Sequence, residues 1–497
     1  MSSTAQDVAP PSPQPVRPGL VHGASTDAAA QMLGELLRKD YVNHHCFFNA
    51  KGFHNHLGHH LVAAYDLGAP PTLLKLIYED EAPAQRPVTR DGEDITLANW
   101  TTRLGEEKAY GSYLVFFADE IAKNGVGQTL KKWLMAPEAN GNGAYMLGRL
   151  LGGALHPFLQ VGFGVEFGQD YMVAQGLALT AITSPEVSLI VLDTPSGLPE
   201  IHPPSTSKAE LPTTQGASSS LLSLLHSVYS SPDLAPILPY DPNALLSARF
   251  RAVAASPTHP AALKAIYSQW PLDTTGSREH FAAKAEECIW QATLLLAATG
   301  KPNRSPRLDF FLMHLLTSAI CLPRMLEVFE DGLHKAQLLQ GYARVTALYV
   351  ILRGRPRIDI PLLMSYSEFP HPPTQAQLPW GGADAVGEPG KEGETDPWPA
   401  ILQNALHHKD AHEVKTIRSL YYGAKHYGQR PAGGAIGARD EEGKETHVGA
   451  GTMDGTIFVR AAGVVSDTLG WVAWGEKEGE WDRSALGWDA AWEDGRV

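Results

Sequence analysis

The sequence predicts a mainly α-helical protein that folds as one large domain. Apolar residues recur at three- and four-residue spacing through most of the chain, beginning with residues 32–37. The alternation that is typical of strands is scarce, and residues 456–460 are the best candidate for a strand. The 497-residue chain, of which 43% is hydrophobic, is long enough to bury a large core.

The expected helices follow from this periodicity and from capping residues. Ser25-Thr26-Asp27 caps a first helix that reaches about Arg38. A second helix carries a histidine-rich run, and the small residues of 141–180 indicate helices that pack closely. The other helical patterns lie at about 73–80, 96–103, 107–123, 127–135, 217–230, 241–254, 258–268, 278–299, 309–319, 322–353 and 410–422.

Amino-acid composition divides the chain into an N-terminal tail, one helical domain and a C-terminal segment. Residues 1–24, rich in Pro, Ser and Gln, are expected to form a disordered tail, and the helical domain follows over 25–430. That domain contains a Pro/Ser-rich loop near 195–216 and a Gly/Pro/acid-rich loop near 372–396. Residues 431–497 are expected to form a Gly-rich loop and a Trp-rich C-terminal segment packed by aromatic contacts.

Charge and cysteine content limit the classes of partner and of metal site that we expect for this protein. A formal net charge of −14, without any basic run, argues against nucleic-acid binding. We find no signal peptide and no apolar stretch long enough to span a membrane, so we expect a cytoplasmic protein that binds small molecules or other proteins. Three widely spaced cysteines, at 46, 288 and 321, do not form a disulfide framework or a Cys-rich zinc site. The oligomeric state stays open.

Four histidines fall within seven residues at the start of the second helix, at positions 54, 56, 59 and 60. On a helix, His56 and His60 lie on one face, because residues four apart are neighbours there. Two imidazoles at this spacing can bind one metal ion. A histidine-rich run on a solvated surface is the alternative interpretation, and the spacing alone does not exclude it.

Three further positions carry groups that bind metals. His156 precedes Pro157, which favours a helix break, and a structural role is an alternative to a ligand role there. His314 lies in a helix that is apolar on all sides, where an imidazole is either a hydrogen-bonded core residue or a ligand. His412 and Lys415 lie opposite the apolar stripe of their helix, so periodicity favours a solvated face for both.

Four sequence blocks in order resemble the fungal questin oxidase-like family. They are residues 54–61, 155–168, 309–315 and 412–421, and the resemblance spans about 30–430. It implies an enzyme of polyketide biosynthesis, in secondary metabolism, that oxidatively opens a ring of an anthraquinone with a Baeyer–Villiger-like outcome. It also implies non-haem iron held by four histidines and a lysine that is carboxylated on its side-chain nitrogen, buried between the helices.

The resemblance implies a set of candidate metal ligands: His56, His60, His156, His314, His412 and Lys415. The set has one histidine more than the family site; the least secure members are His60 and His412, and the reserves are His54 and His59. Asn55 and Glu166 are candidate acceptors for the imidazole N–H groups. We expect His56, His314 and Lys415 to be catalytic.

Carboxylation of Lys415 has a physical basis. The amine must lose its proton before it reacts with carbon dioxide, and both burial and a nearby cation favour that loss by lowering its pKa. The product is an anionic oxygen ligand, which suits Fe(II) beside imidazoles.

The predicted function is therefore Fe(II)- and O2-dependent cleavage of an aromatic polyketide ring, with an external reductant such as NADPH as a further requirement to test. The glycines of 162–168 lack a preceding strand and the dinucleotide spacing, which argues against a flavin enzyme. Two alternatives stay open. One is a metal-dependent hydrolase with a carboxylated lysine, which would need a further Asp ligand, and the other is a non-enzymatic helical protein.

Overall fold

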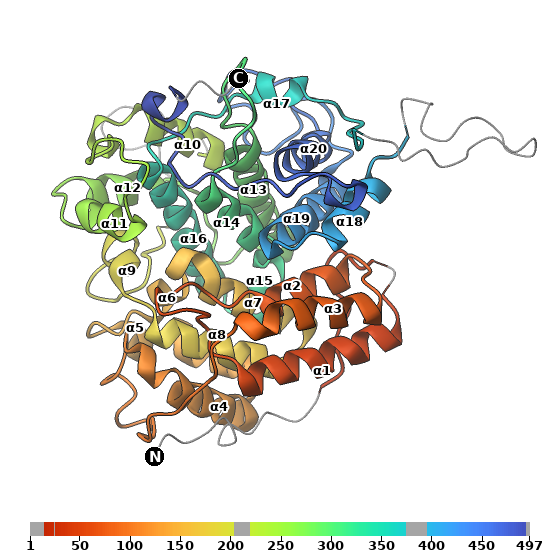
Figure 1. Cartoon of the computed structure of the whole chain (residues 1–497). Helices are drawn as coiled ribbons and strands as arrows, with labels where there is room; N and C mark the ends of the chain where they lie inside the picture. The colour runs from red at the N-terminus through yellow and green to blue at the C-terminus, as the bar shows by residue number, and fades with distance from the viewer. Residues whose placement is uncertain (1–13, 24, 203–218, 374–394, 494–497) are drawn as a thin grey trace, which may run out of the picture.

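The computed structural model describes residues 14–23, 25–202, 219–373 and 395–493, and it confirms the mainly α-helical single domain (Figure 1). Within these ranges we find no strand, only isolated β-bridges. The helices of the N-terminal part are α1 (Asp27–Asn43), α2 (Leu57–Asp66), α3 (Pro71–Glu81), α4 (Tyr110–Leu130), α5 (Pro137–Asn140), α6 (Met146–Leu150), α7 (His156–Phe167), α8 (Asp170–Ile182) and α9 (Glu186–Val191). Those of the C-terminal part are α10 (Leu221–Ser230), α11 (Leu246–Ala254), α12 (His259–Tyr267), α13 (Arg278–Ala297), α14 (Phe310–Ala319), α15 (Leu322–Val328), α16 (Gly332–Leu352), α17 (Ile360–Ser365), α18 (Trp398–Leu406), α19 (Ala411–Tyr427) and α20 (Ile457–Leu469).

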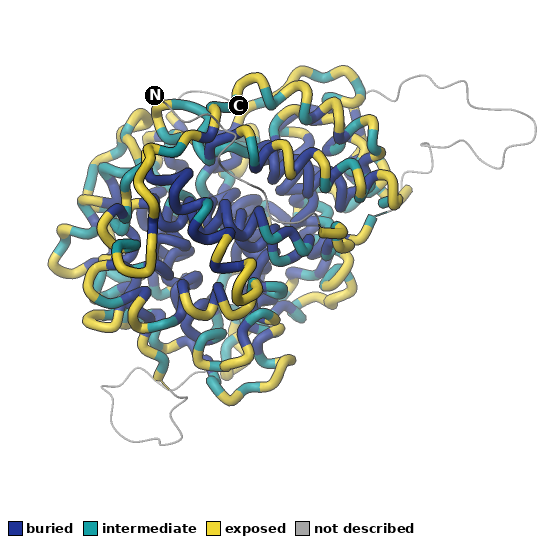
Figure 2. The backbone as a smooth tube through the Cα atoms, turned by 90° about the horizontal axis from the view of Figure 1, so that it is seen from below, coloured by how far each residue is buried: buried dark blue, intermediate teal, exposed yellow. Residues whose placement is uncertain are grey.

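The helices form two groups that meet across the middle of the molecule. Helices α1 to α8 fill the lower half of Figure 1, where α8 packs against both α7 and α4. In the upper half, α13 packs on α14 and α19 packs on α20. The groups join where α2 contacts α19 and where α7 contacts α14 and α15. Figure 2 shows that the central segments are buried, so side chains at this junction are shielded from water.

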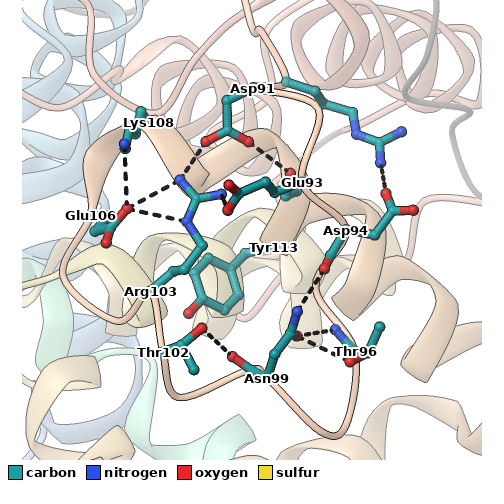
Figure 3. Close-up of polar contacts among 12 residues, drawn as sticks. Asp91, Glu93, Asp94, Thr96, Asn99, Thr102, Arg103, Glu106, Lys108 and Tyr113 are labelled. Carbon is teal, nitrogen blue, oxygen red and sulfur yellow. Dashed lines mark hydrogen bonds and ion pairs between the residues drawn. The ribbon is translucent and has the colours of Figure 1, made fainter.

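The helix expected at 96–103 is not formed, and that prediction was wrong. The segment folds into successive turns (Figure 3). Asn99 Oδ1 accepts the Thr96 N–H at 2.6 Å, a local bond that competes with helix formation. Buried Arg103 then holds the loop through ion pairs with the carboxylates of Asp91, Glu93 and Glu106.

The strand expected at 456–460 is instead the start of helix α20, so this prediction was also wrong. The five-residue window reads as a strand because it is rich in β-branched and aromatic residues. The helical pattern appears only over a longer stretch, whose buried residues include Ile457, Phe458, Ala461, Ala462, Val465 and Leu469.

The helical region expected at 322–353 is divided into α15 and α16. The non-helical segment between the two helices ends at Asp331, whose side chain accepts the Leu333 N–H at 2.8 Å and caps α16. Parts of the predicted loops near 195–216 and 372–396, together with residues 1–13, lie outside the described residues.

Residues 14–23 lie against the core, in contrast to the disordered tail that their composition predicts. The Leu20 N–H donates to Glu166 Oε1 at 2.7 Å, and the Val21 N–H donates to Asp66 Oδ2 at 3.0 Å. Val21 is fully buried. Two buried carboxylates therefore anchor this segment through its backbone.

In the part of the chain that the structure describes, no single helix is long and apolar enough to span a membrane. Helices α14 and α15 pass that test only as a pair bent by 45°, and nearly all of α14 is buried inside the domain. Cys288 and Cys321 are buried, Cys46 is partly buried, and all three are free thiols.

Candidate metal centre

Four histidines from four segments converge at the junction of the two helix groups. His56 caps α2, His156 begins α7, and His314 and His412 lie on α14 and α19. One ring nitrogen from each lies within 4.8 Å of the others. His56 Nε2 and His156 Nε2 are 2.9 Å apart. The structure thus brings together four of the six predicted ligands.

Backbone carbonyls fix the orientation of two of these imidazoles. His156 Nδ1 lies 2.8 Å from the carbonyl oxygen of Gly153, and His314 Nδ1 lies 2.7 Å from that of Phe310. A carbonyl oxygen can only accept, so Nδ1 carries the proton and Nε2 keeps its lone pair. His314 is fully buried, and its Nε2 has no hydrogen-bond partner among the described residues.

A carboxylate fixes the third imidazole. His412 Nδ1 donates to Asp410 Oδ1 at 2.7 Å, and the same oxygen accepts the His412 backbone N–H at 2.9 Å. This leaves His412 Nε2 buried and unpartnered within the described chain. A carboxylate behind the ring is a common arrangement for a histidine that binds a metal ion.

A turn with left-handed backbone places His156 in the cluster. Gly153, Ala154 and Leu155 have φ of 53°, 52° and 63°, immediately before α7. Non-glycine residues rarely adopt this left-handed conformation, because it costs about 1–2 kcal/mol of conformational free energy per residue. The predicted break therefore precedes His156, whose own backbone is helical, with Pro157 in the first turn of α7.

Lys415 and His412 are buried, so the solvated face that periodicity favours for them was wrong. Residues 411–420 of α19 are all buried, because α2, α14, α18 and α20 surround this helix. Lys415 is 1% exposed, and its Nζ makes no hydrogen bond within the described residues. Burial lowers the pKa of Lys415 to about 8.

Burial also keeps the four imidazoles neutral. It lowers the pKa of His56, His156 and His314 well below the usual value of a histidine, and lowers that of His412. Lys415 lowers all four pKa values further, neighbouring histidines lower those of His56, His156 and His314, and the Asp410 carboxylate acts in the opposite direction on His412. Since only neutral imidazole binds a metal ion, the cluster is in its ligating form at neutral pH.

His60 lies outside the four-histidine group, in contrast to its predicted place in the ligand set. Its Nδ1 forms a short hydrogen bond with Glu81 at the end of α3. His56 immediately precedes α2 and contacts His156 through Nε2, whereas His60, one turn later, contacts Glu81. The i, i+4 relationship that links the two residues in the sequence does not bring them to one point.

Neither of the predicted acceptors for imidazole N–H groups contacts the cluster rings by a hydrogen bond. Asn55 accepts the Leu57 N–H at 2.9 Å and donates to Asp40 at 2.9 Å. Glu166 pairs with buried Arg418. Asp410, which the sequence analysis missed, holds His412 instead. The Asp-x-His spacing at the start of the helix is the one local pattern that could have indicated it.

The reserve residues His54 and His59 flank the cluster. The His54 ring stacks on that of His156 with centroids 3.8 Å apart. His59 Nε2 lies 2.7 Å from Gln160 Oε1. Beside them is a cavity of about 20 Å³, lined among others by His54, His59, His156 and Gln160. Its volume suffices for about one water molecule.

The amino-acid sequence is similar to those of known fungal proteins over most of its length. The chain is 25% identical to a Baeyer-Villiger oxidase of Paecilomyces divaricatus, with 97% of this chain and 96% of the relative aligned. It is 25% identical to a questin oxidase of Aspergillus terreus over 80% of each chain. An oxidoreductase of Aspergillus parasiticus is 24% identical, over 81% of this chain and 74% of the relative.

The family model for questin oxidase-like proteins matches residues 53–420, which include all four clustered histidines and Lys415. The match begins just before α2 and ends within α19, so it covers both helix groups and the junction between them. This chain belongs to the questin oxidase-like family.

Proposed function

We propose that this protein is a non-haem iron oxygenase that opens a ring of an anthraquinone-type polyketide, with a Baeyer–Villiger-like outcome. The proposal that it is an oxidoreductase rests on the relatives, which are named as oxidases. The proposal of iron rests on the four-histidine cluster. The anthraquinone substrate follows from the family resemblance.

The residues present fit a metal ion. Two nitrogen ligands at about 2.1 Å from one ion and at right angles to each other are about 3 Å apart. The 2.9 Å between His56 Nε2 and His156 Nε2 matches that separation. The Nε2 atoms of His314 and His412 are buried, unpartnered within the described residues, and carry lone pairs, so each needs either a hydrogen-bond donor or a cation, and one metal ion can satisfy both.

Lys415 is the proposed fifth ligand, after carboxylation. Its Nζ is buried and unpartnered within the described residues, and its lowered pKa makes the neutral amine accessible near pH 8. The carboxylate formed would add one negative charge to a site of four neutral imidazoles. When bound, iron would supply the redox chemistry that lets O2 react with a closed-shell aromatic ring.

The protein side chains would orient the substrate and exclude water. The Phe310 ring lies against His314 and His412, with both centroid separations 4.9 Å, and provides an apolar face beside the cluster. The neighbouring cavity is too small for a tricyclic substrate. An anthraquinone could therefore use this cavity only if the side chains around it moved.

Elemental analysis of untagged protein tests the proposal. About one iron per chain supports it, two zinc or nickel ions favour a hydrolase, and a metal-free, inactive protein favours a non-enzymatic role. The purified protein should show no flavin absorbance. A stoichiometric flavin would contradict the iron mechanism.

A second assay tests the reaction and its electron source. A quinone that gains one oxygen atom from O2 needs two electrons and two protons to release the other atom as water; NADPH can supply the two electrons and one proton as hydride, and solvent the second proton. The corresponding hydroquinone carries those electrons and protons itself. Incubation of each substrate with 18O2, with and without NADPH, followed by mass spectrometry of the product, distinguishes the two routes.

A further inference from the structure

Three consecutive residues near the C-terminus, Trp481, Asp482 and Arg483, contact the N-terminal ends of α14 and α19. We name this segment 481–483 the C-terminal clamp. The two helices that it touches carry His314 and His412. The clamp lies outside the part of the chain that the family model matches.

The clamp reaches His412 through one carboxylate. Trp481 Nε1 donates to Asp410 Oδ2 at 2.7 Å, and the other oxygen, Oδ1, accepts from His412 Nδ1 at 2.7 Å. Trp481 is 7% exposed, so water does not compete strongly for its N–H. Because both oxygens accept hydrogen bonds, Oδ1 from His412 and Oδ2 from Trp481, the carboxylate cannot rotate without breaking a buried hydrogen bond.

The clamp reaches α14 through its backbone. The Phe310 N–H donates to the Asp482 carbonyl oxygen at 2.8 Å, and the Asp482 N–H donates to the Leu308 carbonyl oxygen at 2.8 Å. The Arg483 guanidinium lies 4.1 Å from the centroid of the Phe310 ring. Phe310 is the residue whose carbonyl oxygen fixes the His314 imidazole.

We propose that the C-terminal clamp positions the metal ligands, with Trp481 and Asp410 as positioning residues for His412. The inference rests on the proposed iron site. The two helices come from distant parts of the chain, and the clamp bonds to the start of each. It therefore holds His412 Nε2 and His314 Nε2 toward one point, and the functional centre extends beyond residues 53–420.

Trp481→Phe tests the proposal, because it keeps an aromatic ring and removes the N–H donor. Trp471→Phe is the matched control. Trp471 is also buried, and its Nε1 donates at the same distance, 2.7 Å, to Oδ1 of Asp467, a residue of α20. Each variant is prepared metal-free, its thermal unfolding is recorded, and its Fe(II) affinity is measured by competition with a chromophoric chelator.

We expect Trp481→Phe to weaken Fe(II) binding about tenfold, within the range seen when groups behind metal ligands are changed. Trp471→Phe should bind Fe(II) like the wild type. Asp410→Asn is a second variant: it keeps a capping oxygen for α19 but places an amide nitrogen near the Trp481 N–H. We expect a loss of 10- to 100-fold in affinity, and a shifted visible spectrum of the Co(II)-loaded protein.

Equal Fe(II) affinity in Trp481→Phe, Trp471→Phe and wild type would overturn the clamp while leaving the proposed iron site intact. Equal affinity of Asp410→Asn and wild type would overturn the role of Asp410. A wild-type protein that binds no Fe(II) at all would overturn the proposed function, and the clamp with it. The metal-free unfolding curves separate a loss of positioning from a general loss of stability.

Discussion

His56 Nε2 lies 2.9 Å from His156 Nε2, although the two residues are 100 positions apart in the chain. The His156 ring donates its Nδ1 proton to a carbonyl oxygen, so its Nε2 accepts, and His56 supplies the proton between the two rings. A bound cation would take the place of that proton, and His56 would then carry its proton on Nδ1 instead. Metal binding should therefore change the tautomer of one buried histidine.

The first prediction is that histidines from distant parts of the chain bind the same metal ion. His314→Ala should lose iron as completely as His56→Ala, because both remove one of four converging nitrogens. The measurement is iron content per chain after reconstitution and desalting. The matched control is His60→Ala, which removes a buried imidazole that is bonded to Glu81 outside the group.

His60→Ala should lose stability, by about 1–3 kcal/mol, and retain iron. Full iron content in His314→Ala would contradict the prediction and return His314 to a purely structural role in the core. Loss of iron in His60→Ala would indicate that His60, or the Glu81 that it contacts, contributes to the site.

Most helices could be predicted from the sequence, because an amphipathic stripe of 3.6-residue period is a local property. The errors arose where the local pattern was too short or was overridden. Residues 456–460 have strand-like composition, but they join a helical stripe that extends to Leu469. At 96–103, side-chain hydrogen bonds of Asn99 stabilise turns instead of a helix.

The candidate site was predictable in part, and only through the ordered blocks of the family resemblance. Periodicity placed His412 and Lys415 on a solvated face, because an amphipathic pattern does not show that other helices cover the polar side too. No local pattern relates Trp481 to Asp410, 71 residues earlier. Such contacts are set by tertiary packing.

The second prediction concerns pH and the metal-free protein. Burial and neighbouring charges lower the pKa of His59 well below its usual value of about 6.5. Below about pH 6.5, the unfolded chain therefore binds a proton that the folded protein does not, and the free energy of unfolding falls as the pH falls. The same sign holds for His56, His156 and His314.

Urea denaturation of chelator-treated protein between pH 7.5 and 5 measures this dependence. His59→Gln removes one of the titrating groups, so its slope below about pH 6.5 should be smaller by about 1.4 kcal/mol per pH unit. An unchanged slope would show that His59 does not differ in protonation between the folded and unfolded states.

The third prediction concerns the buried ion pairs behind the site. Arg418 is 1% exposed and pairs with Asp66 at 2.8 Å and with Glu166. Arg418→Met leaves two buried carboxylates without their cation and should lower the free energy of unfolding by about 3–5 kcal/mol. In the control Arg278→Met, whose side chain is 81% exposed, the loss should stay below about 1 kcal/mol. Similar losses in the two variants would contradict the structural role of this cluster.

The fourth prediction concerns Lys415. A lysine with a pKa near 10.4 is neutral in about 0.04% of molecules at pH 7, whereas a pKa of about 8 raises that fraction to about 10%. Only the neutral amine reacts with carbon dioxide, and an ammonium cannot bind a cation. We therefore expect a carbamate signal in the 13C NMR spectrum of protein reconstituted with Fe(II)-mimicking Zn(II) and 13C-bicarbonate.

Variants of Lys415 separate its charge from its bulk. Lys415→Ala and Lys415→Met should both lose metal or activity, although Met fills most of the same buried volume. Lys415→Glu supplies a shorter carboxylate and should recover part of the metal binding. The carbamate signal should disappear in all three variants. If Lys415→Met kept full metal content and activity, or if a high-resolution map showed an unmodified lysine in the loaded enzyme, the site would consist of histidines alone. Its iron would then carry one more positive charge than the carboxylated site.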